Sequence, residues 1–258
     1  MLLSVIIPVF NERLTLPVVL PAIAAALPEV SKEIVIVDDG STDGTREWLR
    51  ANFPSDGGHF ATITAGPDGI DLRPVESGTE PAIEIRVLYH PENRGKGGAL
   101  KTGFAAATGA VLVVQDADLE YDPNDWRRMY DLVAYRQVAD VVYGCRFYGA
   151  PHRSLYFHHY LANRLISFLF NILYNQTLMD IEVCYKMFRR EVLDGIELRC
   201  ADFGIEIELS AKIAKARRWR IYETGISYFG RTYDEGKKIN WRDGVKALWY
   251  LVKFRVMS

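Results

Sequence analysis

The sequence predicts an α/β fold in which a mixed, mostly parallel sheet is flanked by helices. Apolar, β-branched runs alternate with helical patterns along the first half of the chain, and that alternation is typical of parallel sheets. Nearly every apolar run ends in a polar turn, as expected where ligands bind at the carboxyl ends of strands. With 258 residues, 49% of them hydrophobic, we expect one domain over residues 1–258.

Each predicted element follows from its own local pattern. The β-branched runs predict strands at 3–9, 33–38, 84–89, 111–116 and 139–143. The segments between them predict helices at 13–27, 42–51, 97–108 and 123–136. Pro17 and Pro21 limit the regularity of the first helix, whereas Asp122 and Pro123 are typical of an N-cap and a first helical position.

Three further segments depart from this alternation. Residues 52–82 are rich in Pro, Gly, Ser and Thr, with one weak strand candidate at 60–64, so we expect a surface insertion compatible with a hairpin. A helix around 155–174 carries more apolar surface than one buried face requires, which indicates contact with a membrane or a partner subunit. The segment after Trp241 fits either an interfacial amphipathic helix or a helix packed on the core.

Charge and cysteine content narrow the class of protein. The 31 basic and 33 acidic residues nearly cancel, so no global field attracts nucleic acid. Cys145, Cys184 and Cys200 lack a C-x-x-C pair, which argues for reduced core thiols and against structural zinc or disulfides. No stretch reaches the roughly 18 apolar residues of a membrane span, and the start does not resemble a signal peptide. We expect a cytoplasmic protein, free or peripheral on the cytoplasmic face of the membrane.

The most informative segment runs from Val111 to Glu120, where four apolar residues lead into Q-D-A-D-L-E. Asp116, Asp118 and Glu120 stand at alternate positions, and alternate residues of an extended strand share a face. Three carboxylates on one face repel one another unless a cation neutralises them, and such oxygen ligands suit Mg²⁺ or Mn²⁺ with a phosphate-bearing substrate. An isolated D-x-D more often marks a solvated acidic turn, so the assignment depends on the rest of the chain.

Several further motifs make that assignment specific. They are I-I-P-V-F-N-E, V-D-D-G-S-T-D-G-T, N-R-G-K-G-G-A and D-A-D-L-E, in this order. Together they resemble the inverting family 2 glycosyltransferases of GT-A fold. D-A-D-L-E-Y-D-P, D-I-E-V-C-Y-K-M-F-R and R-T-Y-D-E-G-K-K-I-N-W-R-D-G resemble the polyprenyl-phosphate (dolichyl-phosphate) mannose and glucose synthases within that family. The resemblance covers almost the whole chain apart from residues 52–82.

The resemblance implies a donor-binding part at about 1–120. Asp39 would contact the nucleobase, because a buried carboxylate can accept a hydrogen bond from a base N–H. Pro8, Phe10 and Glu12 would line the base and ribose. Pro8 and Phe10 are equally compatible with shaping and packing the turn.

Lys96 and the carboxylate cluster would complete the donor site. Lys96 lies in R-G-K-G-G, which fits neither standard glycine-rich phosphate pattern, yet a lysine between glycines at a helix start can approach a nucleotide closely. The alternative is an exposed flexible turn. The resemblance assigns Asp116 to the ribose side of the nucleotide and Asp118 to the metal. Glu120 stands where this branch often carries Gln and would complete a Mg²⁺ or Mn²⁺ site.

Acceptor recognition is expected in a second part, at about 121–258. A lipid phosphate needs fixed cations, and arginine binds phosphate oxygens bidentately. Arg146 matches an acceptor-phosphate arginine of the family, and Arg164 is a less specific second candidate because the family's second arginine lies in a variable stretch. Glu206 is expected in the site, whereas Asp202 suits the start of a helix.

Arg231 and Lys237 belong to R-T-Y-D-E-G-K-K, which resembles a mobile loop that closes over the donor diphosphate. Cations there would stabilise negative charge on the leaving nucleoside diphosphate. The alternative is an exposed basic loop that faces a membrane.

We therefore expect a hexosyltransferase that moves mannose or glucose from GDP-mannose or UDP-glucose to a polyprenyl phosphate with inversion. An ionised phosphate acceptor needs no strong general base, so catalysis rests on positioning and on stabilising the leaving group. A soluble family 2 enzyme acting on a hydroxyl of a glycan or small molecule stays open, and it would need a base such as Glu206 or Asp202. Intact Asp118, Arg231 and Lys237 argue against a silent sugar-nucleotide-binding protein. A homo-oligomer is compatible with the sequence.

Overall fold

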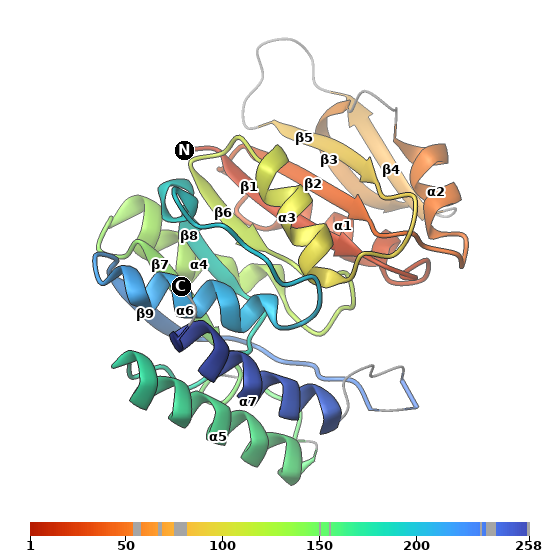
Figure 1. The fold of residues 1–258 in the computed structure, drawn as a ribbon. Coiled ribbons are helices and arrows are strands. Elements are labelled where there is room, and N and C mark those ends of the chain that lie inside the picture. The colour runs from red at the N-terminus through yellow and green to blue at the C-terminus, as the bar shows by residue number, and fades with distance from the viewer. Residues whose placement is uncertain are drawn as a thin grey trace.

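The computed structural model describes residues 1–53, 58–66, 69–74, 82–149, 151–154, 156–232, 234–235 and 241–256. These residues form a mixed nine-stranded sheet with the order β4-β3-β5-β2-β1-β6-β8-β7-β9 (Figure 1). The strands are β1 Leu3–Val9, β2 Lys32–Asp38, β3 Gly58–Gly66, β4 Gly69–Pro74, β5 Ile83–Tyr89, β6 Val111–Val114, β7 Val141–Cys145, β8 Lys186–Arg189 and β9 Ile221–Gly225. In the centre, β5, β2, β1 and β6 pair in parallel, so their carboxyl ends meet at one edge.

The helices pack on the sheet and in a separate layer below it. They are α1 Leu16–Ala25, α2 Thr45–Asn52, α3 Lys96–Ala106, α4 Trp126–Tyr130, α5 Phe157–Tyr174, α6 Ile205–Ala216 and α7 Trp241–Val256. Helix α3 packs against β1 and β2. Helix α7 contacts both α6 and α5 and lies between them, so α5 is separated from the central strands (Figure 1).

The predicted α/β fold with a mixed, mostly parallel sheet is confirmed. The predicted strands correspond to β1, β2, β5, β6 and β7, although β6 ends at Val114 rather than at residue 116. Helices α1, α2 and α3 lie where the sequence placed them. The helix predicted at 123–136 is a composite of a 3₁₀ turn, α4 and a π-helical segment, Asp131–Tyr135. Asp122 caps its first turn through a hydrogen bond from Asn124 N–H, as predicted.

The segment 52–82 contains a hairpin that extends the sheet. Strand β3 pairs antiparallel with both β4 and β5. Phe60 and Ile63 of β3 are buried, and they belong to the main hydrophobic core. The expected hairpin is therefore present, with the weak strand candidate at 60–64 inside β3, and it is part of the sheet rather than a separate surface feature.

Strands β8 and β9 were not predicted. Strand β8 consists of Lys186, Met187, Phe188 and Arg189, so it is short and has no β-branched residue. It pairs antiparallel with β6 and with β7, which places it between these two strands in the sheet. This position brings residues of the second half of the chain next to the carboxyl end of β6.

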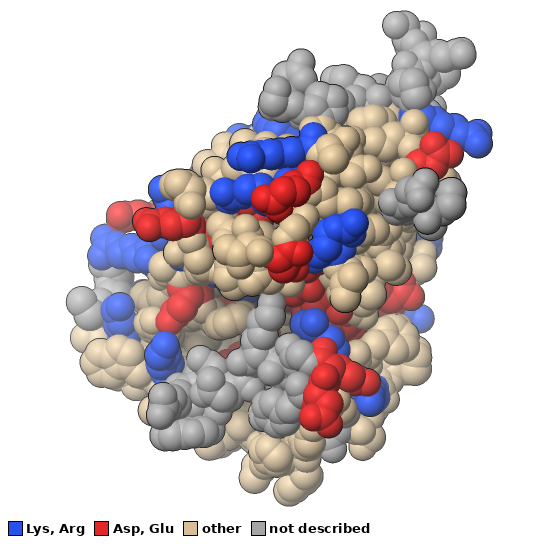
Figure 2. All heavy atoms as spheres, turned by 90° about the vertical axis from the view of Figure 1, so that its right-hand side faces the viewer, with Lys and Arg blue, Asp and Glu red and all other residues tan. Residues whose placement is uncertain are grey.

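The apolar core, the buried cysteines and the mixed surface charge are those that the sequence predicts. Leu3, Val5, Ile6 and Ile7 of β1 have no exposed surface, as expected for a central parallel strand covered on both faces. All three cysteines are free and buried, as predicted. Figure 2 shows basic and acidic side chains interspersed over one face of the molecule, so no field of one sign covers that face.

Candidate active site

A cavity of about 1100 Å³ lies between the carboxyl ends of the parallel strands and the layer of α5, α6 and α7. The predicted site residues that line it are Pro8, Phe10, Glu12, Asp39, Lys96, Asp116, Asp118, Glu120, Arg146, Glu206 and Arg231. Arg164, on α5, is not among the lining residues. Lys237 lies outside the described residues. The fold thus collects residues from both halves of the chain around one space.

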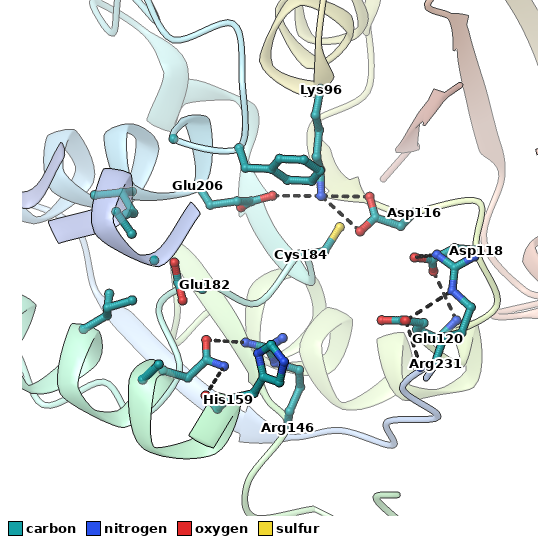
Figure 3. A pocket seen from close by; sticks show the side chains of 18 of the residues that line it. Lys96, Asp116, Asp118, Glu120, Arg146, His159, Glu182, Cys184, Glu206 and Arg231 are labelled. Carbon is teal, nitrogen blue, oxygen red and sulfur yellow. Dashed lines mark hydrogen bonds and ion pairs between the residues drawn. The ribbon is translucent and has the colours of Figure 1, made fainter. Parts of the chain in front are cut away.

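The loop after β6 divides the three carboxylates between two basic side chains (Figure 3). Asp116 Oδ1 lies 2.9 Å from Lys96 Nζ. Asp118 Oδ2 lies 2.9 Å from Arg231 Nη2, and Glu120 Oε1 lies 3.2 Å from Arg231 Nε. The expectation that the three acids share one strand face is wrong. Strand β6 ends before them, and Leu119 has a φ of 63°, so the chain is not extended there.

The acid cluster, formed by Asp116, Asp118 and Glu120, has three carboxylates against the two basic side chains that pair with them. Burial, together with the neighbouring carboxylates of Asp116 and Glu120, raises the pKa of Asp118 to about 7, although Arg231 opposes the shift. Glu120 is also engaged by Arg231 N–H at 3.0 Å and by the Tyr228 hydroxyl at 3.1 Å. A further cation at Asp118 would therefore be electrostatically favoured.

Lys96 is the first residue of α3, and close packing fixes its position. Gly95 has a φ of 78°, and a Cβ at Gly97 would lie 2.5 Å from the carbonyl oxygen of Cys200. Lys96 Nζ also lies 3.2 Å from Glu206 Oε1, so the lysine stands between Glu206 and Asp116 (Figure 3). Burial alone would lower the pKa of Lys96, but these carboxylates raise it well above its usual value. The lysine is part of the cavity wall rather than an exposed turn.

Asp39, at the carboxyl end of β2, is held by a histidine that sequence reasoning missed. His90 Nδ1 lies 2.6 Å from Asp39 Oδ1, and the same oxygen accepts a hydrogen bond from Arg94 N–H at 2.9 Å. His90 Nε2 lies 2.9 Å from Thr102 Oγ1. One feature of the sequence could have indicated this contact. His90 directly follows β5 and Asp39 directly follows β2, and these two strands are parallel neighbours, so their carboxyl ends lie side by side. Asp38 instead pairs with Arg46 of α2, which is a structural contact.

Arg146 follows β7 and is held by a buried acid. Its Nε and Nη2 each lie 2.7 Å from the carboxylate of Asp180, which has no exposed surface. Nη2 also lies 3.4 Å from Asn163 Oδ1 of α5, and the guanidinium stands over the ring of Tyr228. Burial would lower the pKa of Arg146, but Asp180 raises it well above its usual value. A permanent, oriented cation therefore faces the cavity.

Other lining residues were not predicted as site residues. Cys184 was expected only to fill the core, yet its sulfur points toward Lys96 and Asp116 (Figure 3). His159 was assigned no role, but it lies near Arg146 in the same cavity (Figure 3). Asn163 and Tyr228 were also missed, because no local pattern brings α5 and the segment after β9 to Arg146.

The end of the cavity away from the strands is lined by apolar residues of α5 and α7. Phe157, Leu165 and Ile166 come from α5, and Val245 and Leu248 come from α7. Beyond the cavity the same two helices expose further large apolar side chains, namely Leu161, Phe168, Ile172, Trp249, Val252 and Val256. The cavity thus joins a charged region to an apolar surface.

The family model described as "Glycosyl transferase family 2" matches residues 4–64 and 79–196. An undecaprenyl-phosphate 4-deoxy-4-formamido-L-arabinose transferase of Pectobacterium carotovorum is 28% identical over 210 residues, 81% of this chain and 54% of that protein. A dolichyl-phosphate beta-glucosyltransferase of Dictyostelium discoideum is 29% identical, over 73% of this chain and 54% of that protein. The chain spans about half the length of these relatives.

Other similar proteins extend the comparison to solved structures. A polyprenol monophosphomannose synthase of Mycolicibacterium smegmatis is 29% identical over 86% of this chain and 73% of that protein. A glucosyl-3-phosphoglycerate synthase from Mycobacterium tuberculosis, solved with Mn²⁺, UDP and phosphoglyceric acid, superposes with a TM-score of 0.68. It is 18% identical, over 99% of this chain and 79% of that one. This similarity confirms the predicted GT-A fold class.

Proposed function

Because the chain belongs to glycosyl transferase family 2, as its motifs indicated, we propose that it transfers a hexose from a nucleotide-diphosphate sugar to a polyprenyl phosphate with inversion. The curated relatives support this branch, since their names specify undecaprenyl, dolichyl or polyprenol phosphate. Mannose with GDP and glucose with UDP are the donors that we would test first. The donor would bind the part at about 1–120, and the acceptor would bind the part at about 121–258.

The observation that carries the proposal is the single cavity that joins the acid cluster to an apolar wall. Asp39, Lys96 and Asp116 line its strand side, where a nucleotide would lie, and Arg146 stands between that side and α5. Its volume of about 1100 Å³ lies slightly above the range of about 300–1,000 Å³ for small-molecule pockets. A polyprenyl phosphate has the matching chemistry, because its anionic head suits Arg146 and its chain suits α5 and α7.

The reaction that fits these groups is one in-line displacement at the anomeric carbon. A phosphate oxygen of the acceptor forms the new bond to that carbon while the bond to the nucleoside diphosphate breaks. Negative charge then grows on the leaving diphosphate, where Arg231 and Lys96 supply fixed positive charge at the carboxylate cluster. Lys237 would add another cation if its loop closes over the donor, as the resemblance implies.

A divalent metal fits the acid cluster on chemical grounds. Within the described residues, no group of three or more His, Cys, Asp or Glu is arranged as a metal site. Mg²⁺, however, is commonly held by one or two carboxylates together with substrate phosphates. Asp118, whose pKa is raised by burial and by the neighbouring carboxylates, and Glu120 would provide such a pair. Mg²⁺ or Mn²⁺ bound there would neutralise the diphosphate and so make it a better leaving group.

The surroundings of Glu206 and Asp202, the two base candidates from the sequence, support a phosphate acceptor over a hydroxyl acceptor. A hydroxyl acceptor needs a general base within reach. Glu206 faces Lys96 and Lys186, and Asp202 accepts hydrogen bonds from Gly204 N–H and the Tyr250 hydroxyl. Both carboxylates are therefore already engaged by neighbouring groups of the described structure. Transfer to a hydroxyl of a glycan or small molecule remains the second candidate, favoured if purified protein is active without lipid.

We also propose that α5 and α7 rest on a membrane surface. Their exposed apolar residues adjoin the cavity, and α7 carries Lys253 and Arg255 in its last turn. Among the residues that the structure describes, no helix is long and apolar enough to cross a membrane. Binding to anionic liposomes at low salt should be lost in Trp249→Ser, and absence of binding by the wild type would contradict this proposal. A second copy of the chain covering the same face would appear as a dimer in light scattering.

The test of the proposed function is transfer of labelled sugar from GDP-mannose and from UDP-glucose to a short polyprenyl phosphate. Each donor is tested with Mg²⁺ and with Mn²⁺, and Asp118→Asn serves as the control. A metal-dependent lipid product that disappears in the variant is the expected result. Donor binding without lipid product would favour the hydroxyl acceptor, and no binding of either donor would overturn the assignment.

A further inference from the structure

Lys186 of β8 is a charged residue with no exposed surface. Its Nζ contacts Glu206 Oε2 and the carbonyl oxygen of Val183, and it stands 5.4 Å from the centre of the Tyr143 ring. Lys186 is not among the residues that line the cavity. A group so enclosed cannot touch a substrate, so any effect on the reaction must pass through a neighbour.

That neighbour connects Lys186 to the donor side of the cavity. Glu206 offers one oxygen to Lys186 and the other, Oε1, to Lys96 at 3.2 Å. Lys96 in turn lies 2.9 Å from Asp116 Oδ1. The four side chains form a row of alternating charge across β8, α6, α3 and the loop after β6. Figure 3 shows three of its members, with Lys96 between Glu206 and Asp116.

We propose that Lys186 is a positioning residue for the donor: it balances the charge of Glu206, so that Lys96 stays at Asp116 and remains available to a donor diphosphate. This inference rests on the proposed function, because it assigns Lys96 to the nucleotide. Lys186 acts through Glu206 and makes no contact with the substrate.

The charge balance of the row explains why Lys186 matters. A buried charge is costly unless it is paired, so Glu206 requires a cation close by. With Lys186 present, two lysines serve two carboxylates. Without it, Lys96 is the one lysine left in this row of described residues for both Glu206 and Asp116, and the row carries one surplus negative charge. A diphosphate approaching Lys96 would then meet repulsion and a lysine held more strongly by its acids.

A double-variant experiment tests this role. The dissociation constants of UDP and GDP are measured by titration calorimetry for wild type, Lys186→Met, Glu206→Gln and Lys186→Met/Glu206→Gln. We expect Lys186→Met to weaken binding of the preferred nucleotide at least about tenfold, the equivalent of about 1.4 kcal/mol. The double variant should recover most of that loss, because it removes the surplus charge together with the lysine. Thermal unfolding of each variant confirms that it is folded.

Lys32 provides a matched control. It is also a buried lysine, but its Nζ donates only to the backbone carbonyl groups of Ala24, Leu27 and Val30 among its hydrogen bonds in the described structure. Lys32→Met should lower the unfolding temperature without changing nucleotide affinity. The inference would be overturned if Lys186→Met binds the nucleotides as tightly as the wild type. It would also be overturned if the double variant binds them as weakly as Lys186→Met. Absence of UDP and GDP binding by the wild type would instead overturn the proposed function.

Discussion

Arg146 and Asp180 form a bidentate ion pair, with Arg146 Nε 2.7 Å from Asp180 Oδ2 and Nη2 2.7 Å from Oδ1. Asp180 is itself anchored, because its backbone N–H donates to Glu223 Oε1 at 3.0 Å. Arg146 Nη1 takes no part in the ion pair. The pair therefore fixes the direction of a cation that lines the cavity, as the proposed binding of an acceptor phosphate would require.

Asp180→Asn should weaken use of the acceptor without weakening donor binding. The substitution keeps the size of the side chain but removes the charge that orients Arg146. We expect the KM for polyprenyl phosphate to rise at least about tenfold, or about 1.4 kcal/mol, while nucleotide affinity stays within about twofold. Steady-state kinetics and calorimetry separate the two effects. An equal loss of acceptor use and of nucleotide affinity would show that Asp180 supports the site only by stabilising the fold.

Arg231→Met should lower kcat more than it raises the KM for the donor. Arg231 faces Asp118 and Glu120, where charge on the leaving diphosphate would develop, so its effect is expected mainly in the transition state. Loss of one such stabilising group typically costs about 10²–10³ in kcat. Arg127→Met is the matched control, since Arg127 pairs with Glu29 on the exposed surface. A kcat near that of the wild type would show that Arg231 does not stabilise the leaving diphosphate in the transition state.

His90→Leu should weaken nucleotide binding through Asp39. His90 and Arg94 N–H both contact Asp39 Oδ1, so loss of the imidazole leaves the carboxylate less firmly oriented. A hydrogen bond to a charged group is worth about 1.5–3 kcal/mol, which predicts a loss of about tenfold or more in affinity for UDP or GDP. Thr102→Val, which removes only the contact to His90 Nε2, should have a smaller effect. If calorimetry shows no loss of nucleotide affinity in His90→Leu, the proposed orientation of Asp39 by His90 is wrong.

Glu182→Gln should make the protein more stable at alkaline pH. Burial raises the pKa of Glu182 from 4.5 to about 7, against the opposing effect of Arg146. The folded state therefore binds more protons than the unfolded state between these values. The stability that Glu182 contributes is complete below about pH 4.5 and is lost as the pH rises through about 7.

Unfolding temperatures measured at about pH 4 and about pH 8 check this prediction. The Gln variant should match the wild type at the lower pH and exceed it at the higher one. Glu47→Gln, on the exposed surface of α2, controls for the loss of one negative charge. A Glu182→Gln variant that tracks the wild type at both pH values would contradict the raised pKa.

Local patterns in the sequence were sufficient to place the parallel strands in the first half of the chain. The β-branched runs placed β1, β2 and β6, and the polar residues that follow them, among them Asp39 and Asp116, line one cavity as a parallel sheet requires. Strand β8 was missed because four residues without β branching give no strand signal. The common face proposed for the three acids was wrong because Leu119 adopts a positive φ, which is unusual for leucine.

Contacts between distant residues could not be read from local patterns. His90 lies 51 positions from Asp39, Asp180 lies 34 from Arg146, and Glu206 lies 20 from Lys186. Each pair is brought together by strand order or helix packing. The sequence proposed Arg146 and Glu206 as site residues, and both line the cavity, whereas the partners that hold their charges become visible only in the folded chain.

The proposed lipid-phosphate acceptor is tested most directly by comparing two acceptors that have the same polyprenyl chain. Sugar transfer is measured with a short polyprenyl phosphate and with the corresponding polyprenol, under the same donor and metal conditions. We expect transfer to the phosphate alone, and a large loss of that transfer in Arg146→Met. Comparable transfer to the polyprenol, or activity on a soluble sugar without lipid, would contradict the assignment of Arg146 and α5 to a lipid-phosphate acceptor.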